Sequence, residues 1–256
     1  MLTPDGVRYL AMAQGERVAR PFHLRWLAPK ICGQQLTRWT ALTRSSIIAV
    51  GVLTAIFAHS PWMAVVAFAP GICFAWRRPV LVDSLGMALA LGAALTLHLC
   101  WPVAILLACL AGMTRETAPI WASVYAFNPI LLVGLVPVAL RALMRQGPDV
   151  LDEENGWILS HPIKASMKYH AGLWLDWRVM VAPWAGLLAS LSVLDARLTL
   201  ALGLGYAQLL VATDSVRLYQ WAAPALALAT VHAVPQWALP FIAFSIIFNP
   251  WKGSGV

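Results

Sequence analysis

Charge is scarce in this sequence. Only 11% of the 256 residues are charged and 60% are hydrophobic, whereas about a quarter of the residues are charged in ordinary soluble domains. This composition excludes a solvated globular domain and a disordered chain. The 18 basic residues give a net charge of +7, but they are scattered among apolar runs and form no basic face. A nucleic-acid partner is therefore not expected.

Motifs for metal and nucleotide chemistry are also lacking. The four cysteines form no CxxC pair, and the six histidines show neither HxxxH nor HExxH spacing, so no metal site is predicted. The sequence contains no P-loop, GxSxG or GxGxxG motif, which argues against soluble-type nucleotide chemistry. No cofactor is expected.

Long charge-free intervals are what the sequence does contain. A membrane-spanning helix needs roughly 20 apolar residues, and the longest intervals can each hold two short helices, with breaks near Pro61, Pro102 and Pro235. We therefore predict an all-α polytopic membrane protein with about eight or nine short transmembrane helices. The charge-free intervals are residues 45–76, 84–114, 117–140, 179–194, 198–213 and 218–251.

The first 44 residues differ from the rest. They hold seven of the 18 basic residues and no apolar run of spanning length. We predict that residues 1–44 form an interfacial segment, with interfacial helices over residues 21–44, and that residues 45–256 form the transmembrane domain. A polar loop is expected around residues 141–178, and its acidic run at 152–154 is interpreted as solvated. Trp26 and Trp39 are among the residues expected to dip into the membrane surface.

Charges beside apolar segments are the candidate functional residues, because charge is costly in a bilayer. Arg115 and Glu116 have no other charge within 20 residues on either side. They mark either a loop tip between two helices or a site where Arg115 binds an anion and Glu116 orients it. Asp214 and Arg217 share a helical face at spacing i, i+3, and could simply neutralise each other at a helix end.

Two further carboxylates have structural alternatives. Asp83 precedes a serine and an apolar run, which is typical of a helix N-cap. Asp5 is followed by glycine, a pair that usually indicates a turn. We nevertheless expect Asp5, Arg115 and Arg217 to converge on one cavity, because an acidic partner or a lipid phosphate would offset the cost of burying arginine. Glu116 and Asp214 are the nearest acidic partners of the two arginines in sequence.

Four segments, taken in order, resemble the GT-C superfamily of polytopic glycosyltransferases. DGVRYLAMAQG followed by PFHLRWLAP is similar to their first extracytoplasmic loop, and RRPVLVDSLGMALALGAAL to the segment in which an aspartate opens a helix. LLACLAGMTRETAPIW resembles a helix end found in many bacterial members, and ATDSVRLYQWAAPALALA a late element of the superfamily. In that superfamily a first transmembrane helix precedes the acidic loop. The resemblance therefore implies that such a helix lies upstream or has been lost.

The resemblance implies transfer of a sugar from a polyprenyl-phosphate donor in a prokaryotic plasma membrane to an acceptor that the sequence does not identify. Asp5 would be the catalytic base. Some members need a divalent metal, but these residues do not indicate one. The other charged residues of the motifs would bind substrate: Arg115, Glu116, Asp214, Arg217, Asp83, Arg25 and Lys30.

Two other classes of function remain open. A small transporter or channel would line its pathway with the same embedded charges, although the sequence shows no internal repeat. A non-catalytic relative that acts as a membrane scaffold is the other alternative, and the missing first helix favours it.

Overall fold

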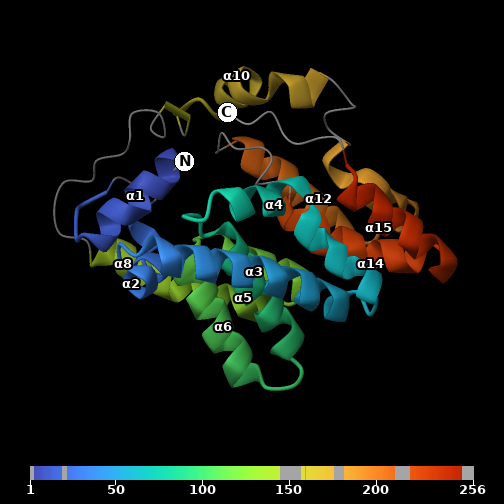
Figure 1. Ribbon diagram of the computed structural model, residues 1–256, viewed down its shortest axis with the longest axis horizontal. Coiled ribbons are helices and arrows are strands. Elements are labelled where there is room, and N and C mark those ends of the chain that lie inside the picture. Colours follow the sequence, from blue (N-terminus) through green and yellow to red (C-terminus); the bar gives the residue numbers. More distant parts are fainter. Residues whose placement is uncertain are drawn as a thin grey trace. The chain divides into compact units, whose positions relative to one another are not determined.

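The computed structural model describes residues 3–18, 22–144, 157–158, 160–175, 182–210 and 220–249. Within these ranges the chain is helical and contains no strand (Figure 1), so the all-α prediction is confirmed there. The chain divides into two compact units. Unit 1 comprises Met1–Val50 and Phe74–Asp152, and unit 2 comprises Gly51–Cys73 and Glu153–Val256.

Unit 1 is built around a helical hairpin formed by α5 and α6, which pack side by side and against α7 and η3. The helices α3 and α4 each pass from one unit into the other. The helices with residues in unit 1 are α1 (Pro4–Ala13), η1 (Phe22–Leu24), α2 (Leu27–Cys32), α3 (Leu36–Phe57), α4 (Pro70–Arg77), α5 (Asp83–Thr96), α6 (Trp101–Thr114), α7 (Ala118–Ala126), η3 (Pro129–Leu135) and α8 (Val136–Leu143).

Small residues allow the backbones of unit 1 to approach closely. Ala90, Ala104 and Ala108 are fully buried, and a Cβ placed on Gly134 would lie 2.4 Å from the carbonyl oxygen of Ala108. Only glycine fits at this crossing of α6 and η3. Small residues at helix contacts are characteristic of helix packing in membranes, where van der Waals contact replaces the hydrophobic effect as the driving force.

Unit 2 is centred on α14, which packs against η4, while α15 packs against both η4 and η2. Thr230 of α14 donates a hydrogen bond to the carbonyl oxygen of Leu187 at 3.3 Å. The remaining helices of this unit are η2 (Pro61–Phe68), α10 (Pro162–Leu175), η4 (Ala182–Val193), α12 (Ala196–Ala207), η5 (Gln208–Leu210), η6 (Gln220–Ala222), α14 (Ala223–Ala233), η7 (Gln236–Ala238) and α15 (Leu239–Ile247).

The three predicted proline breaks are confirmed. Pro61 is the first residue of η2, and three residues separate it from the end of α3. Pro102 lies in the first turn of α6, beyond the end of α5. Pro235 separates α14 from η7. Proline is tolerated at the first turn of a helix because its missing N–H would have no partner there.

The interfacial segment expected over residues 1–44 contains several helices. Residues 21–44 include the short helices η1 and α2, but α3 begins at Leu36, so the expected boundary at residue 44 lies inside a continuous helix. α3 is the one described helix that is long and apolar enough to cross a membrane, and five other apolar helices of 10–17 residues are shorter. Part of the polar loop expected around residues 141–178 is helical, because α10 lies within it; its acidic run at 152–154 lies outside the described residues.

Candidate functional site

The first element of the candidate site is α1, which carries Asp5. The Thr3 hydroxyl caps the helix by accepting a hydrogen bond from the Gly6 backbone N–H at 3.0 Å, and Pro4 occupies the first turn. The turn considered for Asp5 and Gly6 is therefore wrong, since both residues are helical. Asp5 forms an ion pair with Arg8 one turn later, at 3.8 Å, and its carboxylate remains partly exposed.

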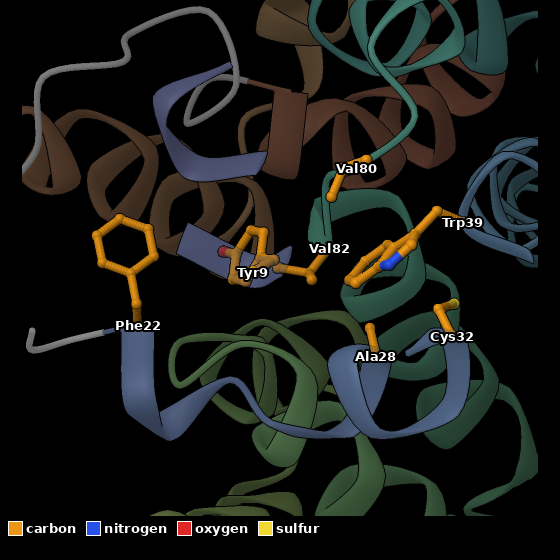
Figure 2. Packing of buried hydrophobic residues seen from close by; sticks show 7 residues of the cluster. All are labelled: Tyr9, Phe22, Ala28, Cys32, Trp39, Val80 and Val82. Carbon is orange, nitrogen blue, oxygen red and sulfur yellow. The ribbon is translucent and has the colours of Figure 1, made fainter. Parts of the chain in front are cut away.

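α1 lies against the segment that leads into α5. A Cβ on Gly6 would meet both the side chain and the carbonyl oxygen of Val80 at 3.3 Å, so a small residue is needed at this contact. Figure 2 shows Tyr9 of α1 between Phe22 and Trp39, with Val82 beside it. The ring centroids of Tyr9 and Trp39 are 6.1 Å apart in a stacked arrangement. This aromatic packing fixes α1 on unit 1 with Asp5 in its first turn.

Arg25 joins α1 to the loop between α6 and α7. Its guanidinium group binds Glu116 through two parallel hydrogen bonds, from Nε to Oε2 at 2.7 Å and from Nη2 to Oε1 at 2.5 Å. Nη1 donates a third hydrogen bond to the phenolic oxygen of Tyr9 at 3.1 Å. The fork-to-fork geometry is the strongest arrangement available to an arginine and a carboxylate, and it joins residues that are 91 positions apart in sequence.

The pairing of Arg25 with Glu116 sets the ionisation states of these two residues. Burial would raise the pKa of Glu116, but the Arg25 guanidinium outweighs burial, with help from Arg115, and lowers that pKa to about 2. For Arg25, burial acts to lower the pKa and the Glu116 carboxylate more than reverses this, so its pKa lies well above the usual value. Burial raises the pKa of Tyr9. At neutral pH, Arg25 and Glu116 therefore form an ion pair, and the Tyr9 phenol beside them is neutral.

A second ion pair lies one residue away along the chain. Arg115, at the C-terminal end of α6, forms a buried ion pair with Asp83, the first residue of α5. The N-cap role considered for Asp83 is wrong, because Val82 holds the N-cap position and Asp83 is the first helical residue. Glu116 was expected to be the partner of Arg115 because it is adjacent in sequence. It binds Arg25 instead.

These residues form one cluster in unit 1, the arginine–carboxylate cluster: Tyr9, Arg25, Asp83, Arg115 and Glu116. The charges of both Asp5 and Arg115 act on the Tyr9 phenol, so the first turn of α1 lies in the electrostatic environment of the cluster. The arrangement offers a partly exposed carboxylate, on Asp5, one turn before Tyr9 in α1, together with two arginines held by carboxylates. Chemically, it could accept a proton at Asp5 and present guanidinium groups to an anion.

The other candidate residues lie elsewhere. Lys30 is exposed on α2, with its Nζ 5.4 Å from the centroid of the Trp26 ring, and it does not join the cluster. Asp214 and Arg217 lie outside the described residues, so the convergence expected for Asp5, Arg115 and Arg217 stays a prediction. No group of three potential metal ligands occurs in the described part of the chain.

Sequence reasoning did not assign a role to Tyr9 and did not find the two pairings. The pairing of Asp83 with Arg115 could have been predicted, because two helices in the charge-free interval at residues 84–114 imply a helical hairpin. A hairpin brings the start of its first helix, at Asp83, to the end of its second, at Arg115. The pairing of Arg25 with Glu116 had no comparable signal, since it depends on where the short helices before α3 are placed.

Comparison of the chain with protein-family models, with curated proteins and with solved structures finds no match.

Proposed function

We propose that this chain is a polytopic membrane protein of the GT-C type, with eight or nine short spanning helices, that transfers a sugar from a polyprenyl-phosphate donor to an acceptor at a prokaryotic plasma membrane. The observation that carries the proposal is the position of Asp5, a partly exposed carboxylate in the electrostatic environment of the buried arginine–carboxylate cluster. A general base and cationic groups for a leaving phosphate are the two chemical requirements of such a transfer.

The membrane part of the proposal is supported by apolar side chains on helix surfaces. Trp101 and Leu106 of α6 are more than half exposed, as are Phe241 and Phe244 of α15. Large contiguous apolar surfaces are rare on soluble monomers, whereas lipid chains cover them at no cost. The short length of most apolar helices fits helices that line a cavity and cross the bilayer with breaks.

The proposed chemistry uses residues of unit 1. Asp5 accepts the proton of the acceptor hydroxyl group while the acceptor oxygen forms a bond to the anomeric carbon of the sugar. The bond between that carbon and the phosphate oxygen breaks, and the polyprenyl phosphate leaves with the electron pair. Arg25 spends three of its five N–H groups on Glu116 and Tyr9, so two N–H groups can stabilise the departing phosphate.

A sugar-transfer assay in lipid, with a polyprenyl-phosphate sugar as donor, tests the proposal. Asp5→Asn is expected to lower transfer by about 100-fold or more, because it removes the base and leaves the side chain's shape unchanged. Glu16→Gln is the matched control: it neutralises an exposed carboxylate just beyond the same helix and should retain transfer. Full activity of Asp5→Asn would refute the assignment of the base.

A non-catalytic scaffold is the second candidate function, and one observation favours it. Arg25 and Arg115 are both bound by carboxylates, so the cluster can neutralise its own charge without any phosphate ligand. In that case wild-type protein would show no transfer, and Asp5→Asn would change neither folding nor partner binding. The transfer assay on wild type therefore separates the two candidates.

A further inference from the structure

A long stretch of the chain carries basic residues and no acidic ones. Between Glu16 and Asp83 the sequence contains eight lysines and arginines and no aspartate or glutamate. Among these eight, Arg25 is neutralised by Glu116 of the arginine–carboxylate cluster. Apart from Arg17, which directly follows Glu16, the other basic residues of this stretch have no adjacent acidic residue in sequence.

Five of them, Lys30, Arg38, Arg44, Arg77 and Arg78, form what we call the basic collar. Three lie over aromatic rings: the Arg44 guanidinium is 5.0 Å from the centroid of the Trp76 ring, Arg78 is 4.4 Å from that of Phe74, and Lys30 is 5.4 Å from that of Trp26. In the described part of the chain, no ion pair joins a collar residue to a carboxylate. All but Arg78 are exposed, and Arg78 is half-buried.

The fold gathers these residues around the N-terminal end of α3. The Thr43 hydroxyl of α3 donates a hydrogen bond to the carbonyl oxygen of Pro79, and Trp39 Nε1 donates one to the carbonyl oxygen of Gly33 at 2.9 Å. The first bond fastens the segment after α4 to the first two turns of α3, and the second fastens the turn after α2. Arg38 lies on those turns itself, and Arg44 directly follows Thr43.

Beyond Arg44 the character of α3 changes. No charge follows before the helix ends at Phe57, and Ile48, Val52 and Ile56, which are spaced four residues apart on one face, are each more than half exposed. Cations that lie against aromatic rings are therefore followed, along the helix axis, by an apolar face. A bilayer leaflet likewise passes from an interface with phosphate groups, where aromatic side chains are enriched, to hydrocarbon.

We propose that the basic collar binds the phosphate groups of anionic phospholipids in one leaflet and thereby anchors the N-terminal end of α3 at the membrane surface. A free phosphate ion would use the same cations but would leave the exposed face of α3 uncovered, whereas a phospholipid covers it with its acyl chains. The proposal rests on the membrane part of the proposed function and is independent of sugar transfer.

Thermal unfolding of the full chain in a neutral detergent, followed by tryptophan fluorescence, tests the collar. The protein is titrated with a short-chain phosphatidylglycerol and, separately, with phosphatidylcholine of the same chain length and with inorganic phosphate. The test variant is Arg44→Gln with Arg78→Gln. The control is Lys164→Gln with Lys168→Gln, which also removes two charges and two cation–π contacts, those of Lys168 with Trp157 and with Tyr169.

Wild type is expected to reach half-maximal stabilisation at a lower concentration of phosphatidylglycerol than of phosphatidylcholine. Each basic residue near an anionic surface contributes about a fivefold factor in affinity, so the double collar variant should need roughly 25-fold more phosphatidylglycerol. The control should behave as wild type, and inorganic phosphate should not stabilise.

Three results would overturn the inference: equal response of wild type to the two lipids, an unchanged collar variant, or a control that shifts as far as the collar variant. Stabilisation by inorganic phosphate equal to that by phosphatidylglycerol would overturn the choice of lipid as the ligand. The absence of a response to either lipid would contradict the membrane part of the proposed function as well. A negative sugar-transfer assay leaves this readout unaffected, so the two failures are distinguishable.

Discussion

The two units bury polar groups of different kinds. In the described part of unit 1 the buried polar residues include Arg25, Asp83 and Arg115, whereas in that of unit 2 they are uncharged: Thr54, Ser60, Ser166, Ser190, Gln208, Gln220 and Thr230. Buried charge requires a partner, because each ion carries a desolvation penalty of several kcal/mol. A buried hydroxyl or amide costs less and can be left without one. Within the described residues, the costly buried charges are thus concentrated in unit 1.

The comparison separates what each unit can contribute to function. Unit 1 holds the arginine–carboxylate cluster, Asp5 and the basic collar, which are groups that can respond to a phosphate or move a proton. Unit 2 contributes buried hydroxyl and amide groups that stay neutral at any physiological pH. The proposed chemistry therefore uses unit 1, and mutations should have larger effects on charged groups there than on polar groups in unit 2.

The largest effect is expected when one partner of the buried ion pair between Arg25 and Glu116 is removed. Glu116→Gln takes away the carboxylate that binds Arg25 at 2.5 and 2.7 Å and leaves the guanidinium buried. Breaking such a pair from one side costs about 3–5 kcal/mol. We expect the free energy of unfolding, measured in detergent by denaturant titration, to fall by that amount.

Two matched variants test the reason for this loss. Glu16→Gln removes an exposed carboxylate and should change stability by no more than about 0.5 kcal/mol. The double variant Arg25→Met with Glu116→Leu replaces both ions by apolar groups and should recover much of the loss. A Glu116→Gln variant as stable as wild type would mean that the pair is not buried in the folded protein.

Acid should weaken unit 1 through the same carboxylate. The pKa of Glu116 is lowered from 4.5 to about 2 in the folded protein, so its ionised form contributes stability at pH values above about 4.5. That contribution, roughly 3 kcal/mol, is lost as the pH falls from about 5 toward 2. We expect the unfolding midpoint of wild type to fall over this range more steeply than that of Glu116→Gln, whose side chain does not titrate. Parallel pH profiles for the two proteins would contradict the assignment.

The helical class and the breaks in the helices could be predicted from sequence because both follow from local chemistry. Charge-free runs exclude a solvated fold, and proline is disfavoured in a helix interior, so a break is expected just before it, as at Pro61 and Pro235. The start of α3 at Leu36 was missed, because Arg38 and Arg44 interrupt the apolar pattern although they do not interrupt the helix. Arginine has a high helix propensity. The charge pattern therefore located the last basic residue before the apolar run, Arg44, and not the residue at which the helix begins.

Local sequence patterns indicated some candidate site residues, but they did not indicate contacts between residues far apart in the sequence. Arg115 and Asp83 became candidates as lone charges beside apolar runs, and they form a buried ion pair with each other. That pairing was not predicted, because contacts between distant segments are set by tertiary packing. Asp5 was found only through a resemblance of motifs. Tyr9 received no role, since a phenol near an arginine has no sequence pattern of its own.

The smallest expected effect is on a buried amide of unit 2, and there the substitution should stabilise the protein instead of destabilising it. Gln220 is 1% exposed, and neither its amide nitrogen nor its amide oxygen has a hydrogen-bond partner among the described residues. A buried amide without partners carries a desolvation penalty that no bond offsets. Gln220→Leu, which keeps a similar volume and removes both polar atoms, should raise the free energy of unfolding by about 1 kcal/mol. Gln236→Leu, at an exposed position in the same unit, is the control and should change it by no more than about 0.5 kcal/mol. A loss of stability in Gln220→Leu would show that the amide has a partner in the folded protein, and unit 2 would then also hold a polar site.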